Sequence, residues 1–139
     1  MLSNTIVKAL EGTHILKYRM KLCTALFAAG VSLPTEGDSG YYQGMEHALY
    51  LLDEMCRQEF EKVISNFNAQ ILNANIAKYR KILIEAIAAH SSMKGQTEYD
   101  YAFREGMYNA LSILDVFCNT EFKKACIEAI NKELGGLNK

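Results

Sequence analysis

Two copies of a lysine–tyrosine–arginine triplet are the residues of this 139-residue chain best suited to binding chemistry: Lys17-Tyr18-Arg19 and Lys78-Tyr79-Arg80. Lysine and arginine donate charge-assisted hydrogen bonds to anions, and a neighbouring aromatic ring can stack on a planar group. The triplets therefore predict a rim that grips an anionic planar ligand such as a nucleotide. The alternative is that each ring packs inside, with its hydroxyl near the edge, and that the flanking cations are solvated.

The triplets belong to an internal repeat. They lie 61 positions apart, and the segment Gly44-Met45-Glu46-His47-Ala48-Leu49 recurs 62 positions later as Gly106-Met107-Tyr108-Asn109-Ala110-Leu111. Such a match over about sixty residues indicates a duplicated unit. We expect a first unit over residues 1–64 and a second over 65–139, packed as one domain.

Tyrosines also cluster where expected loops lead into helices. Tyr41 and Tyr42 form one cluster, and Tyr99 and Tyr101 form the other. Exposed tyrosine is a good anchor for a nucleobase or for a protein partner. We therefore expect Tyr41, Tyr42 and Tyr101 to join the two triplets in a ligand site.

The histidines do not suggest a metal site, because none of them is kept in both copies. His14, His47 and His90 have the counterparts Asn75, Asn109 and Ala29. No repeated ExxH motif of the di-iron bundle type, HExxH motif, glycine-rich phosphate loop or nucleophile elbow occurs. We expect no metal, no cofactor and no catalysis.

Two pairs of carboxylates are kept in both copies. Their members lie six residues apart, which does not place them together on one helix face. We expect surface or interhelical ion pairs instead. The carboxylates are Asp53, Asp115, Glu59 and Glu121, and the expected cations are Lys62, Lys124 and Arg57.

Apolar residues of the first copy recur every three or four positions, which is the helical period. We expect a helix over about residues 4–29, capped by Ser3 or Asn4 and stopped by Gly30. A loop rich in proline, glycine and aspartate follows. A second helix is expected from residues 39–41 to residue 64.

The second copy repeats this plan. A helix is expected over about residues 67–89, a loop over 90–97 and a last helix over 99–134, which Gly135-Gly136 would terminate. Gly44 and Gly106, each followed by an alanine four residues later, indicate close contact between helices.

These elements predict an all-α fold. Two tandem-duplicated helical hairpins would bury their apolar faces against each other as a four-helix bundle with pseudo-twofold symmetry. Pairing of the hairpins across a homodimer is the alternative.

Composition narrows the class of protein. A net charge of -1 gives no strong field for bulk nucleic acid or for a membrane surface. Neither a signal peptide nor an apolar run long enough to span a membrane is recognisable. None of the four cysteines forms a CxxC pair, so we expect small buried side chains in a reducing cytoplasm.

The pattern Tyr-x-x-Gly-Met-x-x-Ala-Leu from Tyr41 to Leu49, found more loosely from Phe103, resembles a helix of small phage-encoded proteins. The chain is similar to compact helical counter-defence proteins of phages, among them the anti-CBASS sponges. This resemblance implies an oligomer in a host cytoplasm that binds cyclic oligonucleotide signals without cleaving them. It implies that the two triplets hold that ligand.

The leading hypothesis is thus a non-catalytic counter-defence protein that sequesters a small anionic nucleotide, cyclic or linear, as a homo-oligomer. The alternative is an inhibitor or adaptor that occludes a host defence protein through the tyrosine-rich loop ends and an exposed helical face. A structural bundle within a larger particle is a third possibility.

Overall fold

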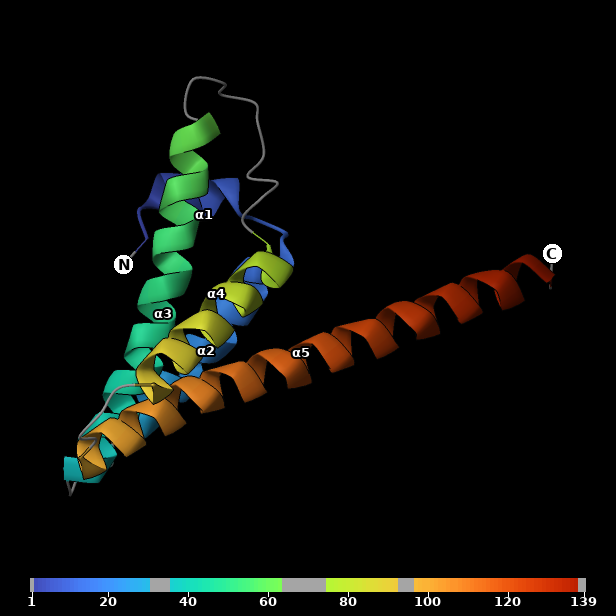
Figure 1. Cartoon of the computed structure of the whole chain (residues 1–139). Coiled ribbons are helices and arrows are strands. Elements are labelled where there is room, and N and C mark those ends of the chain that lie inside the picture. The colour runs from blue at the N-terminus through green and yellow to red at the C-terminus, as the bar shows by residue number, and fades with distance from the viewer. Residues whose placement is uncertain (1, 31–35, 64–74, 93–96, 138–139) are drawn as a thin grey trace.

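The protein is described by a computed structural model covering residues 2–30, 36–63, 75–92 and 97–137. Within those residues every regular element is an α-helix (Figure 1), which confirms the all-α prediction. The helices are α1 (Asn4–Ala9), α2 (His14–Gly30), α3 (Glu36–Val63), α4 (Ile76–Ser91) and α5 (Glu98–Leu137).

The first predicted helix is divided into two. Ser3 caps α1, because its side chain accepts a hydrogen bond from the backbone N–H of Ile6. Gly12 then adopts a φ of 79°, a left-handed conformation that glycine reaches without strain. Thr13 begins α2 by accepting from the N–H of Leu16 at 3.4 Å. A single helix over residues 4–29 was therefore wrong, although α2 does end at Gly30 as expected.

α3 and α5 cross at two glycines. A Cβ added at Gly44 would overlap the carbonyl oxygen of Phe103, and one added at Gly106 would overlap that of Tyr41. Only hydrogen atoms at these positions let the two backbones approach so closely. The interpretation of both glycines as close-packing residues is confirmed, and this crossing is the centre of the fold.

The shorter helices flank the crossing. α2 packs on α3 and α4 packs on α5, with further contacts from α2 to α5 and from α3 to α4. Their buried faces form one core with α1. Its largest fully buried side chains are Tyr18, Tyr79, Leu10, Ile15, Leu22, Met45, Leu52, Leu83, Met107, Leu114 and Cys56.

The end of α5 leaves this core. Its apolar stripe is buried as far as Phe117, whereas every side chain over residues 122–135, which we call the α5 extension, is exposed. Figure 1 shows this stretch projecting away from the other helices. The helix continues through Gly135, so the prediction that Gly135-Gly136 terminates it was wrong.

Other limits shift by a few residues. α3 begins at Glu36, ahead of the expected start. α4 begins after its cap Asn75, whose side chain accepts from the N–H of Lys78 at 2.9 Å. The expected start of that helix at residue 67 and the boundary between residues 64 and 65 lie outside the described residues.

Candidate functional site

The two triplet tyrosines meet in the middle of the core. Both are 0 % exposed, their ring centroids are 5.4 Å apart and their hydroxyl oxygens are 3.3 Å apart. The Tyr18 hydroxyl donates to the carbonyl of Ala110 and the Tyr79 hydroxyl to that of Ala48, each at 3.0 Å. The hydroxyls are therefore inside the core and not at its edge as expected, and neither ring face is open to a ligand.

Burial also fixes the protonation of these phenols. Loss of hydration disfavours the phenolate, so it raises the pKa of Tyr18 and that of Tyr79 well above the ordinary value. Both side chains stay neutral hydrogen-bond donors at physiological pH. Their chemistry in the folded chain is that of structural donors to helix carbonyls.

Both triplet arginines form two-point ion pairs with the duplicated aspartates. Arg19 binds Asp53 through Nε at 2.7 Å and Nη2 at 3.0 Å, and Arg80 binds Asp115 at 3.0 and 3.5 Å. The first pair is far more enclosed, with side-chain exposures of 18 % and 4 % against 46 % for both members of the second. The hydrogen bonds that each guanidinium donates to its aspartate raise the pKa of that guanidinium.

The triplet lysines differ from each other. Lys17 is exposed, whereas Lys78 pairs with Glu59, a carboxylate only 3 % exposed that also accepts from Lys62 at 3.0 Å. These two lysines lower the pKa of Glu59. The predicted pairing of Glu59 with Lys62 is thus confirmed, and Arg57 forms an ion pair with Glu54.

The loop-end tyrosines are more accessible. Tyr41 and Tyr42 are half-buried near the start of α3, and partial burial raises the pKa of Tyr41. Tyr101 is 56 % exposed on α5, and the guanidinium carbon of Arg104 lies 5.0 Å from its ring centroid. Of the predicted site residues, three are exposed to solvent: Lys17, Arg80 and Tyr101.

A histidine–phenylalanine cluster was not predicted. The rings of His47 on α3 and His90 on α4 lie 5.5 and 5.0 Å from that of Phe103 on α5. Burial, and secondly the nearby His90, lower the pKa of His47. No sequence motif marks this cluster, because its three members come from three helices.

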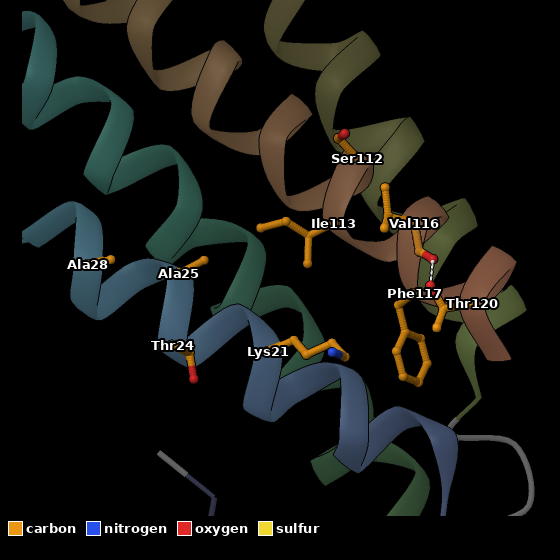
Figure 2. Close-up of a pocket in the computed structure, with 9 residues that line it drawn as sticks. All are labelled: Lys21, Thr24, Ala25, Ala28, Ser112, Ile113, Val116, Phe117 and Thr120. Atoms are coloured by element: carbon orange, nitrogen blue, oxygen red, sulfur yellow. Dashed lines mark hydrogen bonds between the residues drawn. The ribbon is translucent and has the colours of Figure 1, made fainter.

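Sequence reasoning also missed an apolar groove between α2 and α5, which we call the α2–α5 groove. Its volume is about 430 Å³, and Figure 2 shows Lys21 and Ala25 of α2 facing Ile113 and Phe117 of α5 across it. None of the predicted ligand-binding residues lines it. The lining is Lys21, Thr24, Ala25, Ala28, Ser112, Ile113, Val116, Phe117 and Thr120.

The described part of the chain contains neither a candidate metal site nor a candidate membrane-spanning helix. No group of three or more histidine, cysteine, aspartate and glutamate side chains there is placed to hold a metal ion. No helix in those same segments is long and apolar enough to cross a membrane. Searches for similar proteins match no protein-family model, no curated protein and no solved structure.

Proposed function

We propose that the chain is a duplicated helical hairpin that serves as a non-catalytic scaffold for binding another protein, as an inhibitor or adaptor. The pseudo-twofold arrangement is supported by contacts that recur at equivalent positions of the two halves. These are Tyr18–Ala110 with Tyr79–Ala48, Arg19–Asp53 with Arg80–Asp115, and Gly44–Phe103 with Gly106–Tyr41. Because the triplets supply most of these contacts, a role in holding the halves together accounts for their duplication.

The observation that carries the binding proposal is an aromatic and cationic face on α5, made of Tyr101, Arg104 and Tyr108. Spacings of three and four residues place these side chains on one side of the helix. Tyr101 is 56 % and Tyr108 is 51 % exposed, and Arg104 lies over the Tyr101 ring. Tyrosine and arginine are the residue types that contribute most to protein–protein affinity.

The first half of the chain indicates that the fold does not need this face. The positions equivalent to Tyr101 and Tyr108 hold Ser39 and Glu46. A helix of the same kind therefore packs in the first half without exposed tyrosines there. The fold therefore does not need the two tyrosine rings for packing, as expected for residues that bind a partner.

The repeat itself supplies the test. The double variant Tyr101→Ser, Tyr108→Glu installs the first-half residues and should leave the thermal unfolding midpoint within a few degrees of wild type. Wild-type protein immobilised in cell lysate should retain a partner protein that the double variant loses. A Tyr50→Ser variant is the matched control, because Tyr50 is 55 % exposed on α3 and Ser112 holds the equivalent position of the second half, so this variant should retain the same partner. Equal capture by all three proteins would overturn the proposal.

Sequestration of a small anionic nucleotide by the triplets, as in phage counter-defence proteins, stays a prediction. The buried rings of Tyr18 and Tyr79 and the paired guanidinium groups favour a structural role for the triplets instead. Isothermal titration of the folded protein against cyclic and linear nucleotides tests this alternative. Binding that is lost in Lys17→Ala but kept in a Tyr108→Glu variant would favour it over protein binding.

A further inference from the structure

Four exposed apolar residues of α5 lie at the spacing of a coiled coil. From Ile113 onward, steps of three and four residues alternate without interruption, which is the 3.5-residue period of a helix that packs along a partner helix. We call these positions the α5 seam: Ile113, Val116, Thr120, Lys123, Ile127, Ile130 and Leu134. Four of them are large apolar side chains more than half exposed, at 62 % (Val116), 58 % (Ile127), 56 % (Ile130) and 52 % (Leu134).

The seam has two different halves. Its first half, with Ile113, Val116 and Thr120, forms one wall of the α2–α5 groove, and α2 forms the other (Figure 2). A second hollow of about 550 Å³, which shares Thr120 with the groove, continues past Lys123 to Ile127. The second half of the seam lies on the α5 extension, which projects alone from the other helices (Figure 1).

These halves are complementary in size. The groove is walled by small side chains such as Thr24, Ala25 and Ala28, which leave room between the helices. The extension offers the large side chains Ile127, Ile130 and Leu134, for which the described part of this chain provides no burial. Each copy therefore has a groove lined by small side chains and an extension whose large apolar side chains would fill the groove of another copy.

Charge favours one contact of this arrangement. Lys21 of α2 lines the groove, and Glu133 lies beside Leu134 on the extension. The other charged side chains of this stretch are Lys123, Lys124, Glu128 and Lys132, and all of them lie on the extension itself. A carboxylate that approaches Lys21 favours one alignment of the two helices over others.

We propose that the occupant is a second copy of this chain, with the two α5 helices antiparallel and the extension of each copy in the α2–α5 groove of the other. In this register Val116 lies opposite Leu134 of the second copy, Thr120 opposite Ile130, and Lys123 opposite Ile127. Such a contact is isologous, so it closes at two subunits. A parallel alignment would pair the two extensions and leave both grooves empty.

The register makes a specific statement about Cys126. It lies one position before Ile127, on the flank of the seam, and is exposed. Antiparallel pairing in this register sets the two Cys126 residues beside each other at the twofold axis. In a parallel pair they lie on opposite flanks of the coiled coil.

The first arm of the test is the association state of the full-length chain, measured by sedimentation velocity over a concentration series in reducing buffer. We expect a dimer. Ile130→Glu places a charge in the seam and should raise the dimer dissociation constant by at least about tenfold. Phe122→Glu is the matched control, because Phe122 is 70 % exposed on the same extension but off the seam, and it should dimerise as wild type does.

The second arm is oxidation of the chain with copper–phenanthroline. We expect a covalent dimer that Cys126→Ser abolishes and that Ile130→Glu strongly reduces. Circular dichroism should show equal helix content in all variants, because each changed side chain is exposed.

A chain that stays monomeric at every concentration, or a dimer that is indifferent to Ile130→Glu, overturns the proposal. So does a dimer that Cys126 does not link, which would point to parallel pairing. A monomer whose seam instead captures a helix of a different protein also overturns it. None of these outcomes alters the Tyr101 and Tyr108 test, since those residues precede the seam.

Discussion

At the residue scale, the two tyrosine hydroxyls are the most consequential polar groups of the core. Each hydroxyl has a single proton, and each directs it to a helix carbonyl of α3 or α5. The two hydroxyl oxygens also lie 3.3 Å apart, so either hydroxyl can share its proton with the other as well as with its carbonyl. The pair joins the flanking helices to the crossing helices at one point.

Removal of either hydroxyl should destabilise the fold. Tyr18→Phe and Tyr79→Phe should each lower the free energy of unfolding by about 1–2 kcal/mol, because a buried hydrogen bond is lost. The double variant should lose less than the sum, since both single variants remove the same hydroxyl–hydroxyl contact. Urea unfolding of the four proteins measures this cycle.

Tyr101→Phe is the control for that cycle, because the Tyr101 side chain is more than half exposed, and it should unfold as wild type does. A strictly additive double variant would show that the two hydroxyls do not interact.

His47 should make stability depend on pH. Burial lowers the pKa of His47 below its ordinary value of 6.5, so the unfolded chain takes up a proton more readily than the folded chain. The free energy of unfolding is therefore highest above pH 6.5 and falls as the pH drops through the lowered folded pKa. His47→Asn, which installs the residue found at the equivalent position 109, should flatten this fall in urea titrations between about pH 7.5 and 5.

The exposed His14 supplies the comparison, and His14→Asn should keep the fall. A wild-type protein equally stable at both ends of that range would contradict the assignment to His47.

At the element scale, the glycine crossing sets how closely α3 and α5 approach. Gly44→Ala or Gly106→Ala places a methyl group on a backbone carbonyl oxygen of the facing helix. The clash is with backbone, so no side-chain rotation can relieve it. We expect a loss of at least about 3 kcal/mol in the free energy of unfolding, by overpacking against backbone. Thermal melts followed by circular dichroism report it.

Gly135→Ala is the matched substitution, because an added Cβ there meets nothing within 4 Å. It should raise helix content and leave the melting midpoint of the core unchanged. A Gly44→Ala protein as stable as wild type would mean that the helices cross elsewhere.

The helices themselves could be predicted from the sequence because their signals are local. The three-to-four residue period locates α3, α4 and most of α5, and the paired small residues at Gly44 and Gly106 indicate the crossing. The break at Gly12 was missed, although a glycine followed by threonine is a common end-and-start signal. Apolar spacing alone does not tell whether a partner helix exists, so the sequence does not reveal that Phe122, Ile127 and Ile130 are exposed.

The candidate site was less predictable because it depends on contacts between distant residues. The Tyr18 hydroxyl binds the carbonyl of Ala110, 92 positions away, and backbone carbonyls carry no side-chain signal. Arg19 and Asp53 are likewise brought together by packing of α2 on α3. The triplets were recognised as significant from their repetition, but their partners became visible only in three dimensions.

At the scale of the whole molecule, the α5 extension is a helix with nothing to pack on within the described part of the chain. Amides of an isolated helix exchange readily, whereas amides in a packed core exchange only on global opening. In dilute protein we therefore expect hydrogen–deuterium exchange of residues 123–134 to be much faster than that of residues 107–117. The two stretches belong to one helix, so the contrast reports packing alone.

Protection of residues 123–134 should rise with protein concentration as the extension enters the groove of a second copy. Protection of residues 107–117 should stay constant over the same series. Exchange of the extension that is slow even in the most dilute sample would contradict this account of α5.

The reciprocal tie between tyrosines and carbonyls also has a consequence for synthesis on the ribosome. α2 is translated before α5, the last of the five described helices, yet its Tyr18 hydroxyl donates to the carbonyl of Ala110 on α5. The glycine face of α3 also packs on α5. At about 5–20 residues per second, the gap between the two partners lasts on the order of 5–20 seconds. The nascent chain must carry two unpaired apolar helices through that interval, and chaperone binding is then expected before release rather than after it.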